Sequence, residues 1–368
     1  MKERKTLTRY VGIDLGKRNY QMAVVGKGGK VTNSNGTTYA AGRQSLYKKL
    51  RATDKVALEA CSLAFIMAKE MEAAVGCKVY VMNSGRLSVI YKSMKKTDKE
   101  DALKLAHILE DFSEDRLPVV PVPSDKEMKR RKILANYRRV QQNRTRCINL
   151  LHALFVAQGI TTKKCKDLST EEQRKEAIRE LTGIERDEAL YLVECLNLCE
   201  KRIEKLEYQI EEESLEDKEI ERLQSIPGVG PKVAFAFVSH VGAERFENAS
   251  QLSNYLGLVP RVYMSGDTVR YGPITKRGNS YVRAMLVQAA WSIVRAREGG
   301  KLREMFEYMT IIKSKNKKKA IVAVARQLAE LMYVMLRDGT WYAKRPLIPY
   351  SVESGTLAKR LARIKLSA

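Results

Sequence analysis

Histidine is scarce in this chain: the 368 residues include three, and no two stand near each other in the sequence. This scarcity argues against a metal site built on imidazoles. The six cysteines form no Cys-x-x-Cys pair, which argues against zinc and disulfides and favours reduced, mostly buried thiols. No apolar run reaches the roughly 18 residues that a membrane-spanning helix needs, and no secretory apolar core follows the basic N-terminus. We therefore expect a soluble, cytoplasmic protein without a membrane partner.

Acidic side chains are also in the minority, with 43 Asp and Glu against 67 Lys and Arg and a formal net charge of +24. Such a balance suits a polyanionic partner, either nucleic acid or an anionic membrane surface. The charge is unevenly placed, since residues 171–221 hold 18 acids and 8 bases, whereas residues 126–146 hold nine bases and one acid. We expect the acidic segment to contact protein. The basic segment is expected to hold nucleic-acid phosphates through Arg130, Arg131, Arg138 and Arg139.

Residues 1–123 have the pattern of an α/β domain. Runs rich in Val, Ile and Tyr predict strands at residues 9–14, 20–25, 55–59 and 78–82. Helical patterns lie between and after these strands, near residues 43–51, 62–74 and 97–110. Three prolines close to the end of this domain predict a stiff linker out of it.

Residues 124–221 are expected to form a helical domain. An apolar stripe over residues 189–210 is a heptad seam about three repeats long. Two interpretations stay open: two helices packed as an antiparallel hairpin, or a coiled-coil arm that pairs subunits. Beyond this domain we expect a mostly α-helical domain over residues 222–310 and a basic helical extension over residues 311–368.

Four acids of the first domain lie where their carboxylates can converge. Asp14 closes the first predicted strand and Glu59 closes the third, while Asp98 and Asp101 share a face at the start of a helix. Converging carboxylates repel one another unless a cation lies between them, and Mg²⁺, with Mn²⁺ as the alternative, prefers such oxygen ligands. On a basic chain this set predicts metal-dependent phosphodiester chemistry. The plainer alternative is that Asp98 caps a helix and Glu59 is a surface acid.

A glycine-rich turn lies between two helical stretches at residues 227–230. The backbone N–H groups around Gly228 and Gly230 can hold a phosphate at the start of the next helix, where Lys232 adds a charge. This pattern is typical of a helix–hairpin–helix element, a sequence-independent grip on nucleic acid. The alternative is an ordinary glycine turn that joins two helices.

Ser265 precedes a glycine on a segment expected to be a loop. Phosphate-binding side chains follow it at Arg270, Lys276 and Arg277. A serine is a poor nucleophile unless its proton is removed or its target is strongly polarised, and no histidine is near it in the sequence. On spacing alone, a turn serine is favoured over a nucleophile.

These residues carry a resemblance to a known family that covers nearly the whole chain. The first domain resembles the RuvC-type, ribonuclease-H-like domain of the transposases of insertion sequence family 110, which are RNA-guided recombinases. The family's Asp-Glu-Asp-Asp set falls on the four acids above, and the run Lys-Thr-Asp-Lys-Glu-Asp-Ala at residues 96–102 matches its last two members closely. The segment 226–279 is similar to the family's C-terminal transposase domain, whose nucleophilic serine would be Ser265.

The resemblance implies site-specific DNA recombination that moves an insertion sequence within a prokaryotic, nucleoid-associated setting. It implies that a noncoding RNA pairs with donor and target DNA, and that Mg²⁺ at the four acids polarises the phosphate that Ser265 attacks. The acids and the serine are far apart in the sequence, so the domains must meet, either within one chain or across the subunits of a dimer or tetramer.

Three other functions remain open. A RuvC-like endonuclease would hydrolyse DNA with Ser265 in a structural role. An actin-like ATPase shares the strand that ends at Asp14, but the chain shows no second glycine-rich phosphate loop. A purely architectural nucleic-acid-binding protein would have no use for the four acids.

Overall fold

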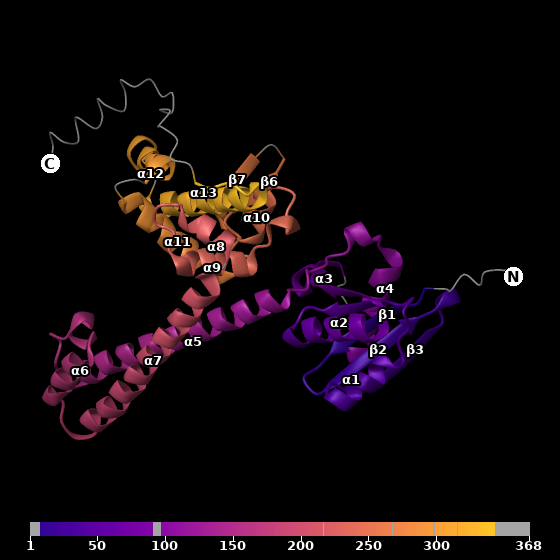
Figure 1. Ribbon diagram of the computed structural model, residues 1–368, viewed down its shortest axis with the longest axis horizontal. Helices are drawn as coiled ribbons and strands as arrows, with labels where there is room; N and C mark the ends of the chain where they lie inside the picture. The colour runs from indigo at the N-terminus through magenta and orange to yellow at the C-terminus, as the bar shows by residue number, and fades with distance from the viewer. Residues whose placement is uncertain are drawn as a thin grey trace. The chain divides into compact units, whose positions relative to one another are not determined.

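The computed structural model describes residues 8–90, 97–215, 217–266, 268–296, 299–314 and 316–342. The chain divides into two compact units, Met1–Ser124 and Asp125–Ala368, and each is described by itself (Figure 1). Within the described ranges, no helix combines the length and the apolar character that crossing a bilayer requires.

The N-terminal unit is built on one mixed, five-stranded sheet with the strand order β3-β2-β1-β4-β5. Strand β1 pairs antiparallel with β2 and parallel with β4, while β2 and β3 are antiparallel and β4 and β5 are parallel. The bounds are β1 Tyr10–Leu15, β2 Asn19–Val25, β3 Val31–Thr37, β4 Lys55–Glu59 and β5 Lys78–Met82. The predicted mixed α/β fold is confirmed. Strand β3 was not predicted, because it is an edge strand whose mostly polar, exposed residues show no apolar alternation.

Helices cover both faces of this sheet, and strand alternation decides which residues meet them. Val11, Ile13 and Leu58 point to one face and pack against residues of α1 and α2. Ala57, Tyr80 and neighbouring residues point to the other face and pack against α4. The bounds are α1 Ala40–Tyr47, α2 Ser62–Val75, α3 Ser84–Ile90 and α4 Asp98–Asp111.

Gly12 brings α4 into direct contact with β1. A Cβ atom at this position would lie 2.0 Å from the carbonyl oxygen of Ala102 and 2.6 Å from the amide nitrogen of Ala106. The backbones of strand and helix therefore approach as closely as a residue without a side chain allows. This approach places the first turn of α4 over the strand that carries Asp14.

The C-terminal unit begins with two helices of 33 residues each, α5 (Asp125–Ala157) and α7 (Gly183–Leu215), which run along each other (Figure 1). The short helix α6 (Glu171–Ala177) lies between them in the sequence. Buried residues of the predicted heptad seam, including Ala189, Leu192 and Leu196, pack against Leu151 and Phe155 of α5. The seam is therefore occupied within the chain, as the hairpin interpretation requires.

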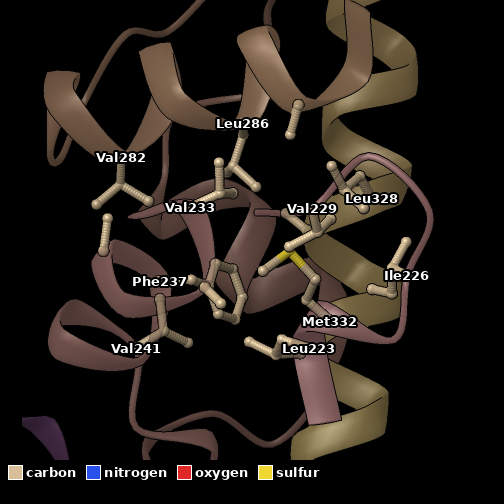
Figure 2. Packing of buried hydrophobic residues seen from close by; sticks show 14 of the residues in the cluster. Leu223, Ile226, Val229, Val233, Phe237, Val241, Val282, Leu286, Leu328 and Met332 are labelled. Carbon is tan, nitrogen blue, oxygen red and sulfur yellow. The ribbon is translucent and has the colours of Figure 1, made fainter. Parts of the chain in front are cut away.

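The remaining helices enclose the largest apolar core of the protein. In Figure 2, residues of α8, α9, α11 and α13 interdigitate, and the side chains of Phe237 and Met332 both point into the cluster. The bounds are α8 Lys218–Gln224, α9 Pro231–His240, α10 Ala249–Tyr255, α11 Ser280–Arg295, α12 Gly300–Glu307 and α13 Lys317–Asp338.

A two-stranded hairpin projects between α10 and α11 in the sequence, formed by β6 (Pro260–Ser265) and β7 (Thr268–Ile274). The expected loop around Ser265 was therefore wrong. Two short runs rich in Val and Tyr on either side of a glycine were the signal for a hairpin. Nearly all of its side chains are exposed, so no half-buried alternation marked the strands.

Candidate active site

Asp14 and Glu59 lie side by side at one edge of the N-terminal sheet. The parallel register pairs Gly12 with Ala57 and Ile13 with Leu58, so the next step brings Asp14 opposite Glu59. Alternation along each strand places both acids on the face that carries Gly12 and Ala57, which α4 covers. The strand ends thus aim two carboxylates toward the start of α4.

The first turn of α4 supplies the other two acids. Thr97 caps the helix, accepting a hydrogen bond of 3.3 Å from the amide of Glu100. Asp98 and Asp101 fall in the turn that follows: Asp98 precedes Ala102 by about one turn, and Asp101 immediately precedes it. Ala102 is one of the residues of α4 that meet Gly12. The cap begins the helix here, and the glycine contact fixes where its acidic end lies.

The carboxylate of Asp14 interacts electrostatically with the other three. Burial raises the pKa of Asp14 above its ordinary value of 3.8, and the charges of Asp98, Asp101 and Glu59 raise it further. A hydrogen bond from the Leu15 backbone acts in the opposite direction on this pKa but is the smallest of these causes. The structure therefore places the other three acids near enough to Asp14 for their charges to raise its pKa.

The chemistry of this donor set fits a hard divalent cation, since it offers carboxylate oxygens that repel one another. The side chains are not gathered to coordinating distances, however: among the described residues, no three His, Cys, Asp or Glu side chains are placed to hold a metal ion. Asp101 accepts a hydrogen bond of 2.7 Å from Lys104 Nζ, a partner that sequence analysis missed although its three-residue spacing was a signal.

Ser265 is exposed at the tip of the β6–β7 hairpin, in the other unit. It pairs with Thr268, and Gly266 turns the chain at a φ of +55°. Strand alternation places Tyr263 on the face of Ser265, and Arg270 pairs with Tyr263 across the hairpin. Arg270, a long cationic side chain, is thus the diagonal cross-strand neighbour of Ser265. Asp267, next to the turn, lies outside the described residues.

Comparison with known proteins connects both regions to one family. Residues 11–158 match a model of DEDD transposases of the IS110 type, described as "Transposase". Residues 220–306 match a model described as "Transposase IS116/IS110/IS902 family". The chain belongs to the IS110/IS116/IS902 family of transposases. It is therefore an enzyme of a class that cuts and rejoins DNA.

Relatives of this transposase align along most of its length. A "Probable family 20 transposase" of Pseudomonas aeruginosa is 28% identical over 348 residues, covering 90% of this chain and 98% of the relative. The "Transposase for insertion sequence element IS1111A" of Coxiella burnetii is 25% identical over 336 residues, with 89% of each chain covered. The corresponding protein of element IS1328 from Yersinia enterocolitica is 26% identical, covering 91% of this chain and 98% of its own length.

The glycine turn of the transposase is explained largely by packing. Gly228 has a φ of +86°, and a Cβ atom there would lie 2.9 Å from the backbone nitrogen of Ile293. Gly230 has open space around it and precedes Pro231, the first residue of α9. Lys232 forms an ion pair with Glu207 and lies 5.5 Å from the ring of Tyr137, so its ammonium group is engaged within the protein.

Lys276 and Arg277 are exposed on a loop that the transposase holds firmly. The guanidinium of Arg283 donates to the carbonyl oxygens of Leu256 and Gly278 at 2.9 and 3.2 Å, and also to that of Arg277. Lys276 adopts a positive φ of 56°, which the surrounding contacts fix. These two cations are therefore presented outward on an ordered backbone.

Arg130 was included in the predicted nucleic-acid-binding set, but the structure buries its side chain. Its side chain is buried, with 3% exposed, and donates to Asp217 at 2.8 Å and to the Glu213 carbonyl oxygen at 2.9 Å. A guanidinium so enclosed by its partners cannot reach a phosphate, and its role is to join α5 to the end of α7. The sequence alone did not separate it from Arg131, Arg138 and Arg139, which stay on or near the surface.

Proposed function

We propose that this transposase cuts and rejoins donor and target DNA through a covalent serine–DNA intermediate, with a noncoding RNA as its guide. The observation that supports the catalytic part is the electrostatic coupling of Asp14 to Glu59, Asp98 and Asp101. A mutually repelling set of acids destabilises the fold unless it serves a ligand, and on a chain of net charge +24 it would serve a cation.

In this proposal Asp14, Glu59, Asp98 and Asp101 hold Mg²⁺ or Mn²⁺. A divalent cation bound there would supply Lewis acidity toward a phosphate oxygen. The chain's own contribution is to fix two carboxylates on strand ends and two on a capped helix turn, so that little reorganisation is needed when DNA arrives. Lys104 would release Asp101 from its hydrogen bond as the acids take up their ligand.

Ser265 supplies the nucleophile. Its hydroxyl oxygen forms a bond to the phosphorus of the scissile phosphate while the bond from phosphorus to the leaving sugar oxygen breaks. The hydroxyl proton passes to water, the leaving oxygen takes up a proton from water, and the departing strand ends in a free hydroxyl group. The phosphoserine ester keeps the phosphodiester energy, so that a new strand end can reverse the step without ATP. Arg270 is the nearest cation on the hairpin to pair with the attacked phosphate.

Charge and surface support the proposed partners. The exposed bases of α5, the β6–β7 hairpin and the loop after it suit DNA and RNA backbones. On α7, Ile184, Tyr191 and Leu198 are exposed at intervals of seven residues, which suits a second copy of the chain in a dimer or tetramer. This stripe differs from the buried seam and leaves the intrachain contacts with α5 intact.

The decisive experiment traps DNA on the purified protein with its RNA, then maps the modified residue by mass spectrometry. Wild type should form a DNA adduct on residue 265. Thr268→Ala, which removes the exposed hydroxyl paired with the serine across the hairpin, is the control and should form the same adduct. Ser265→Ala should form none, a loss of more than about a hundredfold. A variant that still nicks DNA without an adduct would instead support the second candidate, a RuvC-like endonuclease that acts by hydrolysis.

A further inference from the structure

A cavity of about 270 Å³ opens between α5, α9 and α11, within the C-terminal unit. Arg131, Arg138 and Arg139 line it, and none of its described lining residues is acidic. Buried or partly enclosed guanidinium groups normally face carboxylates in their own protein. We call this cavity the arginine pocket.

The three guanidinium groups are only partly satisfied by the protein. Arg139 is exposed and has no ion pair or hydrogen bond to the described part of the chain. Arg138 donates to Ser280 Oγ at 3.2 Å and lies 5.7 Å from the ring of Tyr281. Arg131 donates to the Ser239 carbonyl oxygen at 2.7 Å, and its guanidinium lies 3.6 Å from Glu127.

The other polar groups of the pocket do not cancel this charge. Burial lowers the pKa of His240 to about 4 and raises that of Tyr281 to about 12, so both rings are neutral near pH 7. The buried Tyr281 hydroxyl has no hydrogen-bond partner among the described residues. Asn279 caps the 16-residue helix α11 at this wall, which adds the positive end of a helix dipole.

The size and surroundings of the pocket define its ligand. Its volume is too small for a duplex but accommodates one phosphate with part of its sugar. Exposed Lys132 and Arg146 stand seven residues before and after Arg139 on α5, about 10 Å to either side. This row of cations continues past the pocket in both directions. A polymer with repeated phosphates could contact the whole row, whereas a free anion would need only the pocket.

We propose that the arginine pocket binds a backbone phosphate of a nucleic acid strand that runs along α5. The inference rests on the proposed function for the identity of its ligand, since DNA and RNA are the partners considered there. It concerns a different site, because neither the four acids nor Ser265 lines the pocket. The guanidinium fork suits a phosphate through two parallel hydrogen bonds.

The test measures binding by fluorescence anisotropy with a labelled DNA duplex and a labelled RNA hairpin. All proteins carry Ser265→Ala, so that binding is read without strand cleavage. Arg139→Ala removes a cation that has no described partner, and Arg179→Ala is its matched control on the acidic part of the chain. Ala135→Glu places a carboxylate at an exposed position on the wall of the pocket, and Ala74→Glu makes the same charge change at an exposed position of α2. Both helices accept glutamate readily.

Arg139→Ala should weaken binding about fivefold and reduce the salt slope by about 0.9 for duplex DNA or about 0.7 for a single strand. Ala135→Glu should weaken binding by at least as much, while both controls bind like the parent. A loss confined to one probe identifies the strand that the pocket holds. Should Ala135→Glu fail to fold by circular dichroism, Arg139→Ala decides the outcome.

The proposal is overturned if Arg139→Ala and Ala135→Glu bind as their controls do, or if the parent protein binds neither probe. The covalent adduct assay on Ser265 is scored separately. A pocket that fails this test therefore leaves the proposed chemistry standing, and an absent adduct leaves the pocket standing.

Discussion

Asp14 is a residue at which the candidate site has an electrostatic cost. It is half-buried at the end of a strand, and three further carboxylates raise its pKa. The raised pKa means that the folded protein holds this proton more tightly than the unfolded chain does. Stability is therefore lost as pH rises from 3.8 through the folded pKa, and the full cost is present above it.

Asp14→Asn should consequently make the N-terminal unit more stable than wild type near pH 7 in buffer containing a chelator. The advantage should vanish once the pH falls below 3.8, because the wild-type carboxyl is then protonated in both states. Urea unfolding at the two pH values checks this. Asp111→Asn, the same charge change at the exposed end of α4, is the control. If the Asp14→Asn variant is less stable than wild type at neutral pH, the account is contradicted.

At the scale of elements, the contact between β1 and α4 makes the site. A strand-end acid and a helix-start acid meet only because Gly12 lets the two backbones touch. The sequence predicted the strand, the helix and the acids, but it did not reveal this contact. A glycine within a strand indicates only that the strand is locally less stable.

Gly12→Ala should destabilise the N-terminal unit by about 1–3 kcal/mol, because α4 must move away from its Cβ atom. Gly26→Ala is the control: it has a φ of −105°, and its Cβ atom would meet nothing closer than 3.7 Å. Its effect should stay within about 0.5 kcal/mol. Hydrogen exchange of the backbone amides in β1 and α4 measures the local loss of protection. Equal protection in the two variants would show that the close approach does not hold α4 in place.

The elements that sequence analysis missed share a physical cause. Strand β3 and the β6–β7 hairpin bury few side chains, so neither shows the alternation by which buried strands are recognised. Arg130 was misjudged for the opposite reason, since the partner that buries it, Asp217, stands far along the chain. Local patterns report an element's own periodicity, whereas edge pairing and buried ion pairs depend on distant residues.

For the molecule as a whole, the division of charge is the feature that relates structure to function. The chain carries a net charge of +24, yet the acids of the N-terminal sheet edge repel one another, and a second acidic region lies on α7. A strongly basic protein has little general attraction for cations, so a specific response to a divalent ion must come from one of these acidic places.

Thermal unfolding titrated with Mg²⁺ and Mn²⁺ tests the central claim, that Asp14, Glu59, Asp98 and Asp101 form one cation site. Wild type and Glu211→Gln, which alters an exposed acid of α7, should both rise in Tm with cation concentration. A rise of about 2.7 kcal/mol in stability is expected at a hundred times the Kd. Asp14→Asn should lose the response. If Asp14→Asn responds as wild type does, or wild type does not respond at all, the acids are not a metal site.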